Sequence, residues 1–124
     1  MVGYYGASGN HSHGFTYDGT TWTALDVSGA YSTLPLDIDG DNIVGTYSDP
    51  YGNIMHGFLY NKGTWTTLDM PGALWTCIYG ISGNTLVGMY HDASYTEHGF
   101  IYTIPEPATL LLLGLGGLLL RKKR

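Results

Sequence analysis

Hydrophobic and polar residues alternate along most of the first hundred positions. In residues 13–17 the ring-bearing side chains His13, Phe15 and Tyr17 fall at every second position, which places them on one face of a strand. Similar patterns predict strands at 2–5, 21–26, 31–36 and 43–47, with turns rich in Gly, Asn and Asp between them. The chain therefore predicts an all-β fold of short strands.

The pattern also repeats. The tetrapeptide Val-Gly-x-Tyr occurs three times, and His-Gly-Phe occurs three times; their first residues are Val2, Val44, Val87, His13, His56 and His98. Residues 13–43 match residues 56–86 at 14 of 31 positions. Four short strands per 43 residues is the period of a propeller blade. We predict a domain at 1–103 built of propeller-like four-stranded blades, with units at 2–43 and 44–86 and a partial unit at 87–102.

A glycine stands in the middle of one strand of each unit, at positions 14, 57 and 99. Glycine weakens a strand unless another backbone or ring comes close. Face-to-face packing of successive sheets would supply that closeness, so these glycines predict stacked sheets.

Charge is divided sharply between the repeats and the end of the chain. Up to Thr103 there is one base, Lys62, against nine acids, whereas the last four residues are all basic. An acidic body repels phosphate backbones, which excludes nucleic-acid binding. The single cysteine, Cys77, has Leu34 as its counterpart one unit earlier, which favours a buried apolar role over a reactive thiol.

The repeat elements resemble a known extracellular family. Their order is H-G-F-x-Y, W-T-x-L-D, G-A-x-x-T, G-I-S-G-N and V-G-x-Y, and they span residues 2–102. They look like the HAF repeats, named for a His-Ala-Phe signature, with Gly as the middle letter here. The resemblance implies propeller-like arrays on secreted bacterial proteins, and it implies an architecture more than an activity.

Candidate chemistry in the repeats is sparse. The three recurring histidines lie one unit apart, so a structural role is favoured, bonding a turn or packing on Phe. Asp37, Asp39 and Asp41 alternate like the start of a calcium loop. However, the sixth and twelfth positions of that loop are Asn42 and Ser48 instead of Gly and Glu, which favours a plain turn.

Asp26 and Asp69 lie one unit apart, and we expect their carboxylates to accept hydrogen bonds from backbone N–H groups. Hydrolase, phosphate-binding and metalloprotease motifs are absent from the sequence, so we expect no enzyme activity and no cofactor. The spacing of the tyrosines and tryptophans favours packing in the core. The alternative is an exposed groove of aromatic side chains, which could stack on sugar rings.

The last twenty residues carry a different signal. A Pro-Glu-Pro triplet at 105–107 precedes an apolar run from 108 to 120, and a basic end follows it. Thirteen helical residues span about 20 Å, which is short of the roughly 30 Å hydrocarbon core. We expect a short hydrophobic helix whose basic end stays cytoplasmic, with the acidic repeats on the far side of the membrane.

This tail resembles the PEP-CTERM sorting signal, which is recognised by the membrane protease exosortase. The resemblance assigns residues 104–124 to the signal and predicts transient anchoring in the inner membrane, cleavage near the triplet and release to the cell surface. Its parts are the sorting motif and the anchor with its basic stop, namely Pro105, Glu106, Pro107, Leu110, Leu120, Arg121, Lys122, Lys123 and Arg124. An ordinary tail anchor is the alternative.

These features predict an exported surface or matrix protein whose repeats bind or scaffold an extracellular polymer such as a polysaccharide. The alternative is the C-terminal fragment of a secreted propeller enzyme acting on glycans, and a gene remnant is a third reading. No signal peptide precedes the first strand, and a propeller has four to eight blades. We therefore expect the chain to be the C-terminal part of a longer protein.

Overall fold

The described part of the chain is all-β. A computed structural model describes residues 1–6, 9 and 11–104. Its strands are β1 (Val2–Gly6), β2 (Ser12–Tyr17), β3 (Trp22–Ala24), β4 (Thr33–Asp39), β5 (Asn42–Ser48), β6 (Met55–Asn61), β7 (Thr64–Thr67), β8 (Trp75–Ser82), β9 (Thr85–His91) and β10 (Glu97–Thr103). The predicted all-β class is confirmed. The predicted C-terminal hydrophobic helix lies outside the described residues.

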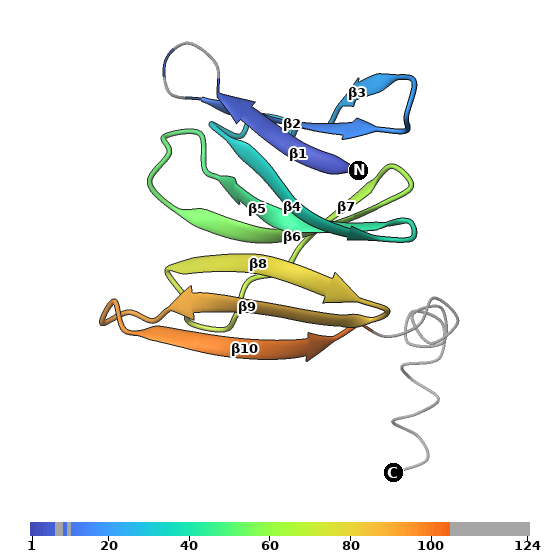
Figure 1. Cartoon of the computed structure of the whole chain (residues 1–124). Coiled ribbons are helices and arrows are strands. Elements are labelled where there is room, and N and C mark those ends of the chain that lie inside the picture. The colour runs from blue at the N-terminus through green and yellow to red at the C-terminus, as the bar shows by residue number, and fades with distance from the viewer. Residues whose placement is uncertain (7–8, 10, 105–124) are drawn as a thin grey trace, which may run out of the picture.

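The strands form three antiparallel sheets that lie one above another (Figure 1). The first sheet has the order β1-β2-β3, the middle sheet β4-β5-β6-β7 and the last sheet β10-β9-β8. The prediction of four strands in every sheet is therefore correct only for the middle sheet of the part described. The first sheet holds the counterparts of β5, β6 and β7, and the last sheet those of β4, β5 and β6.

The predicted units are also out of phase with the sheets. The boundary between units 2–43 and 44–86 falls inside β5, because β4 pairs with β5 through the tight turn at Gly40, whose φ is +60°. The link from β3 to β4 is instead a longer loop that passes to the next sheet. The fourth strand of each 43-residue unit therefore pairs in the sheet that follows.

The three sheets share one pairing register. Gly3 pairs with Phe15, Gly45 with Phe58, and Gly88 with Phe100. A Cβ atom on Gly3 would lie 2.8 Å from the Phe15 ring, and one on Gly88 would lie 2.8 Å from the Phe100 ring. In the first and last sheets the glycine of Val-Gly-x-Tyr therefore leaves room for the phenylalanine of His-Gly-Phe on the neighbouring strand, whereas a Cβ on Gly45 would first meet the Leu34 carbonyl oxygen of β4.

The mid-strand glycines lie where the next sheet comes closest. A Cβ on Gly14 would be 2.7 Å from the Pro35 ring of β4, and one on Gly57 would be 2.9 Å from the Ile78 side chain of β8. The predicted close approach is confirmed at both positions. Beside Gly99, the nearest described atom is a backbone oxygen of its own sheet at 3.9 Å.

Two apolar clusters hold the stack together. One joins the first and middle sheets through buried Leu25, Ile43 and Phe58. The other joins the middle and last sheets, and its buried members are Val44, Ile78, Ile81 and Leu86. Strands β4 and β8 make the contacts between sheets, since β4 touches β1 and β2, and β8 touches β4, β5 and β6. The core therefore lies between sheets, where burial of apolar area stabilises the stack.

Candidate functional site

Two of the recurring histidines, His13 and His56, each contact an aspartate that also accepts a backbone N–H, an arrangement that we call a His–Asp bracket. Asp26 accepts a hydrogen bond from the Gly14 N–H at 2.9 Å, and its second oxygen lies 3.1 Å from His13 Nδ1. Asp69 does the same with the Gly57 N–H at 3.2 Å and His56 Nδ1 at 2.7 Å. Each bracket ties a strand to the loop that leads into the next sheet.

The brackets explain two of the sequence repeats. The Asp of W-T-x-L-D accepts a backbone N–H, as predicted, and the partner histidine belongs to H-G-F. Sequence reasoning missed this side-chain pair, although the matched spacing of 13 residues in both copies was its signal. In the last sheet, His98 Nε2 lies 2.9 Å from Asp92, an aspartate of the hairpin loop between β9 and β10. These contacts give the histidines structural roles in the stack.

The three calcium candidates each contact a different partner in the structure. Asp37 accepts the Ile81 N–H at 2.8 Å, and Asp39 accepts the Gly83 N–H at 2.5 Å. Asp41 lies 3.4 Å from Lys62 Nζ. The expected turn follows directly after Asp39, at Gly40 and Asp41, whereas Asp37 lies within β4. The carboxylates of Asp37 and Asp39 join the middle sheet to the last.

The described residues hold no cluster of three or more His, Cys, Asp or Glu side chains arranged to bind a metal ion. Cys77 is half-buried, in keeping with the apolar role expected from its counterpart Leu34. Burial raises the pKa of its thiol, which keeps the less reactive protonated form at neutral pH.

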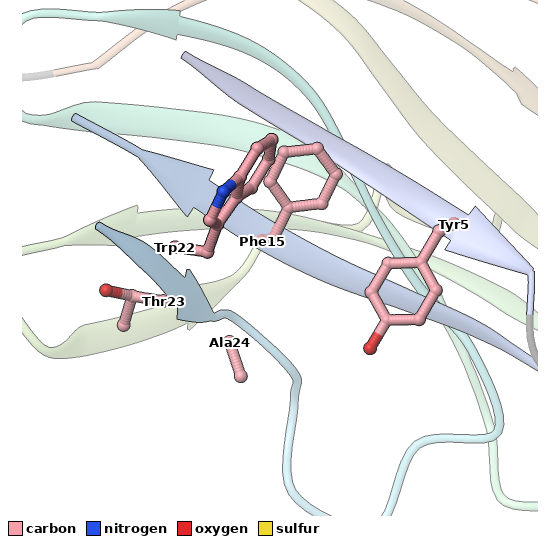
Figure 2. Close-up of a pocket in the computed structure, with 5 residues that line it drawn as sticks. All are labelled: Tyr5, Phe15, Trp22, Thr23 and Ala24. Atoms are coloured by element: carbon pink, nitrogen blue, oxygen red, sulfur yellow. The ribbon is translucent and has the colours of Figure 1, made fainter. Parts of the chain in front are cut away.

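Aromatic side chains surround a hollow of about 440 Å³ on the first sheet (Figure 2). The Phe15 and Trp22 rings lie edge to face at 4.9 Å, and the Tyr5 ring lies 6.4 Å from Phe15. Thr23 and Ala24 of β3 complete the lining. Trp22 is 61 % exposed, so this aromatic group is accessible at the surface.

The counterparts of these aromatic residues are less exposed in the middle sheet. Phe58, the counterpart of Phe15, is only 1 % exposed and lies in the buried cluster with Leu25. The Tyr47 hydroxyl lies 2.7 Å from Thr67 Oγ1, and Thr67 is the counterpart of Ala24. The sequence predicted either a core or an exposed groove for these aromatic residues. The structure shows the core arrangement in the middle sheet and an open one in the first.

Three surface carboxylates have pKa values below the ordinary 3.8 of aspartate. Hydrogen bonds from the Thr21 and Thr20 N–H groups lower the pKa of Asp18, and a bond from the Asn53 N–H lowers that of Asp49. The pKa of Asp92 is lowered by its hydrogen bond with His98 first and by the Thr96 N–H second. All three stabilise turns in their ionised form.

These carboxylates predict an acid-side loss of stability. Since their folded pKa values are depressed, the unfolded chain binds more protons near pH 3.8, so the stabilisation is present above that pH and disappears as the pH falls through the folded values. We expect the melting temperature to fall steadily below about pH 4. Asp49→Asn should flatten this dependence, because an amide oxygen still accepts the Asn53 N–H and does not titrate. A melting temperature that is constant down to pH 2.5 would contradict this account.

The tail is assigned by comparison with known proteins. The family model of the PEP-CTERM protein-sorting motif matches residues 103–124. The sorting signal predicted at 104–124 is therefore confirmed, and the matched segment holds the triplet, the apolar run and the basic end. Those residues, from Pro105 onward, lie outside the described part of the chain. No curated protein and no solved structure matches the chain.

The sorting motif indicates an exported protein that is sorted through exosortase. The resemblance of residues 2–102 to HAF repeats stays a prediction. Residues 1–6, 9 and 11–104 contain no helix long and apolar enough to cross a bilayer.

Proposed function

We propose that this chain is a non-catalytic surface or matrix protein of a bacterium, delivered and processed through its C-terminal signal. The observation that carries the proposal is the sorting motif at residues 103–124. The apolar run anchors the chain in the inner membrane for a time, and exosortase cleaves near Pro105 to Pro107. The acidic repeats are then released on the outer side.

In this proposal the three sheets are successive blades of a propeller-like array that binds or scaffolds an extracellular polysaccharide. Support comes from the stacked sheets, which repeat one packing geometry, and from the exposed aromatic side chains Tyr5 and Trp22. Flat aromatic faces of this kind suit the apolar faces of sugar rings. The His–Asp brackets support a non-catalytic role, because each one already bonds a strand to a loop.

Two epitope tags on one chain test the sorting step. One tag is inserted at Gly19, in the exposed turn between β2 and β3, and the other follows Arg124. We expect surface material to carry the turn tag and to lack the terminal tag. In matched cells without exosortase, both tags should stay together in the membrane fraction. Surface material that retains both tags in exosortase-positive cells would favour an ordinary tail anchor instead.

A further inference from the structure

Strand β1 occupies a position that is paired on both sides in the other two sheets. It carries the first copy of Val-Gly-x-Tyr, whose other copies lie in β5 and β9. Strand β5 lies between β4 and β6, and β9 lies between β8 and β10. Within the part of the chain that the structure describes, β1 pairs only with β2. Among the described residues, no strand lies on its other edge at the place that β4 or β8 takes in the neighbouring sheets.

The pairing of β1 with β2 shows which backbone groups face that open edge. Met1 and Tyr17 exchange both of their backbone bonds, at 2.9 and 3.1 Å. Hydrogen-bonded pairs alternate along an antiparallel ladder, so Gly3 and Tyr5 also bond toward β2. The N–H and C=O groups of Val2, Tyr4 and Gly6 consequently point away from it.

This edge lacks the features that usually protect edge strands. The sequence of β1 is Val-Gly-Tyr-Tyr-Gly, with no charged residue and no proline. Charges and prolines on an edge prevent strand addition, and their absence leaves a template for another strand. The Tyr4 and Tyr5 side chains are both exposed on β1.

The hollow beside β1 has a defined occupant in the middle sheet. There the Phe58 ring packs in one buried cluster with Leu25, which precedes β4 by eight residues. Phe15 is the counterpart of Phe58 and opens onto the hollow of Figure 2. In the last sheet, Leu68 precedes the matching Thr76 of β8 by the same eight residues and packs against the second cluster. In both the middle and the last sheet, the first strand is thus preceded by a leucine that packs in the adjoining apolar cluster.

We propose that the edge of β1 and the hollow beside it form an acceptor site for an extended segment of another polypeptide. The segment has the pattern of residues 25–39, in which a leucine is followed eight residues later by a strand beginning Thr-x-Pro or Thr-x-Ile. Its strand pairs with the outward groups of Val2, Tyr4 and Gly6, and its leucine covers the Phe15 ring. Main-chain bonds supply affinity in such strand addition, and the side-chain contact supplies selectivity.

A synthetic peptide with the sequence of residues 25–39 tests the proposal on the full chain. The readout is hydrogen exchange of individual backbone amides, measured with and without the peptide. We expect saturable binding that slows exchange of the Val2, Tyr4 and Gly6 amides at least tenfold, since strand pairing protects amides from exchange. A peptide carrying Leu25→Asp should bind several-fold more weakly.

A matched pair of variants tests whether the peptide binds at the edge of β1 or elsewhere on the surface. Tyr4→Pro removes an outward N–H while the bonds of Gly3 and Tyr5 to β2 are retained, and Tyr4→Ala removes the same side chain but keeps the N–H. Binding should be lost in the proline variant and kept in the alanine variant. Three results would overturn the proposal: no slowing in the unaltered chain, equal slowing in Tyr4→Pro, or β1 already protected in a dimer of the chain alone.

Discussion

Replacing Gly57 by alanine lowers the free energy of unfolding by about 2–3 kcal/mol, whereas the same change at Gly99 alters it by less than about 0.5 kcal/mol. A Cβ on Gly57 would lie 2.5 Å from the Leu68 carbonyl oxygen and 2.9 Å from Ile78. Neither the backbone of the loop nor the buried core can move away without separating the middle and last sheets. Chemical denaturation of the two variants beside the unaltered chain measures the difference.

Gly99 is the matched control because it holds the same place in His-Gly-Phe and pairs with β9, the counterpart of the strand β5 with which Gly57 pairs. Among the described atoms its nearest neighbour is 3.9 Å away, so a methyl group fits there without a clash. Gly14→Ala is a second variant that we expect to be destabilised, since its Cβ would meet the Leu25 carbonyl oxygen and Pro35. Equal losses at Gly57 and Gly99 would show that strand conformation, not sheet stacking, requires these glycines.

Neutralising the basic end should abolish delivery of the protein to the surface. We expect replacement of Arg121, Lys122, Lys123 and Arg124 by glutamine to reduce surface material at least tenfold, because in the proposed function these charges hold the end of the anchor in the cytoplasm. Immunoblotting of surface and membrane fractions against the repeats measures the change.

The control for this experiment keeps the charge and changes the residues. Exchanging each Lys for Arg and each Arg for Lys preserves four positive charges, so sorting should continue. Both variants leave every residue of the described strands, the last of which ends at Thr103, unchanged. Normal surface delivery of the glutamine variant would show that the basic end is not part of the signal.

Local patterns in the sequence predicted most strands correctly. The alternation in residues 13–17 corresponds to β2, and that in 43–47 corresponds to β5. The strand predicted at 31–36 forms as β4, at Thr33–Asp39. A turn at Ala30, whose N–H bonds the Val27 oxygen, delays its start, and a bulge between Pro35 and Asp37 lets it continue.

Long-range pairing could not be predicted from the repeat. A period of 43 residues defines the length of the unit but not which sheet its fourth strand joins. The carboxylates of Asp37 and Asp39 illustrate this limit, because their partners at Ile81 and Gly83 are 44 residues away. Their spacing in sequence was compatible with a plain turn or the start of a calcium loop, whereas the strand carries both side chains to backbone groups of another sheet.

The aromatic hollow shows the same limit at a candidate site. Tyr5, Phe15 and Trp22 match Tyr47, Phe58 and Trp65 in sequence, yet only the second group lies between two sheets. Exposure depends on the neighbouring sheet, which residue type alone does not specify. The change from Thr67 to Ala24 was the one local signal that the two groups differ. The tail, in contrast, could be recognised directly because its three parts are adjacent in sequence.

The proposed function requires removal of the C-terminal signal when the protein reaches the surface. Mass spectrometry of the C-terminal peptide from surface-extracted protein measures this step. We expect a last residue near Pro105 to Pro107, with the segment from Leu110 to Arg124 lost. A surface protein whose terminal peptide still ends at Arg124 would contradict it.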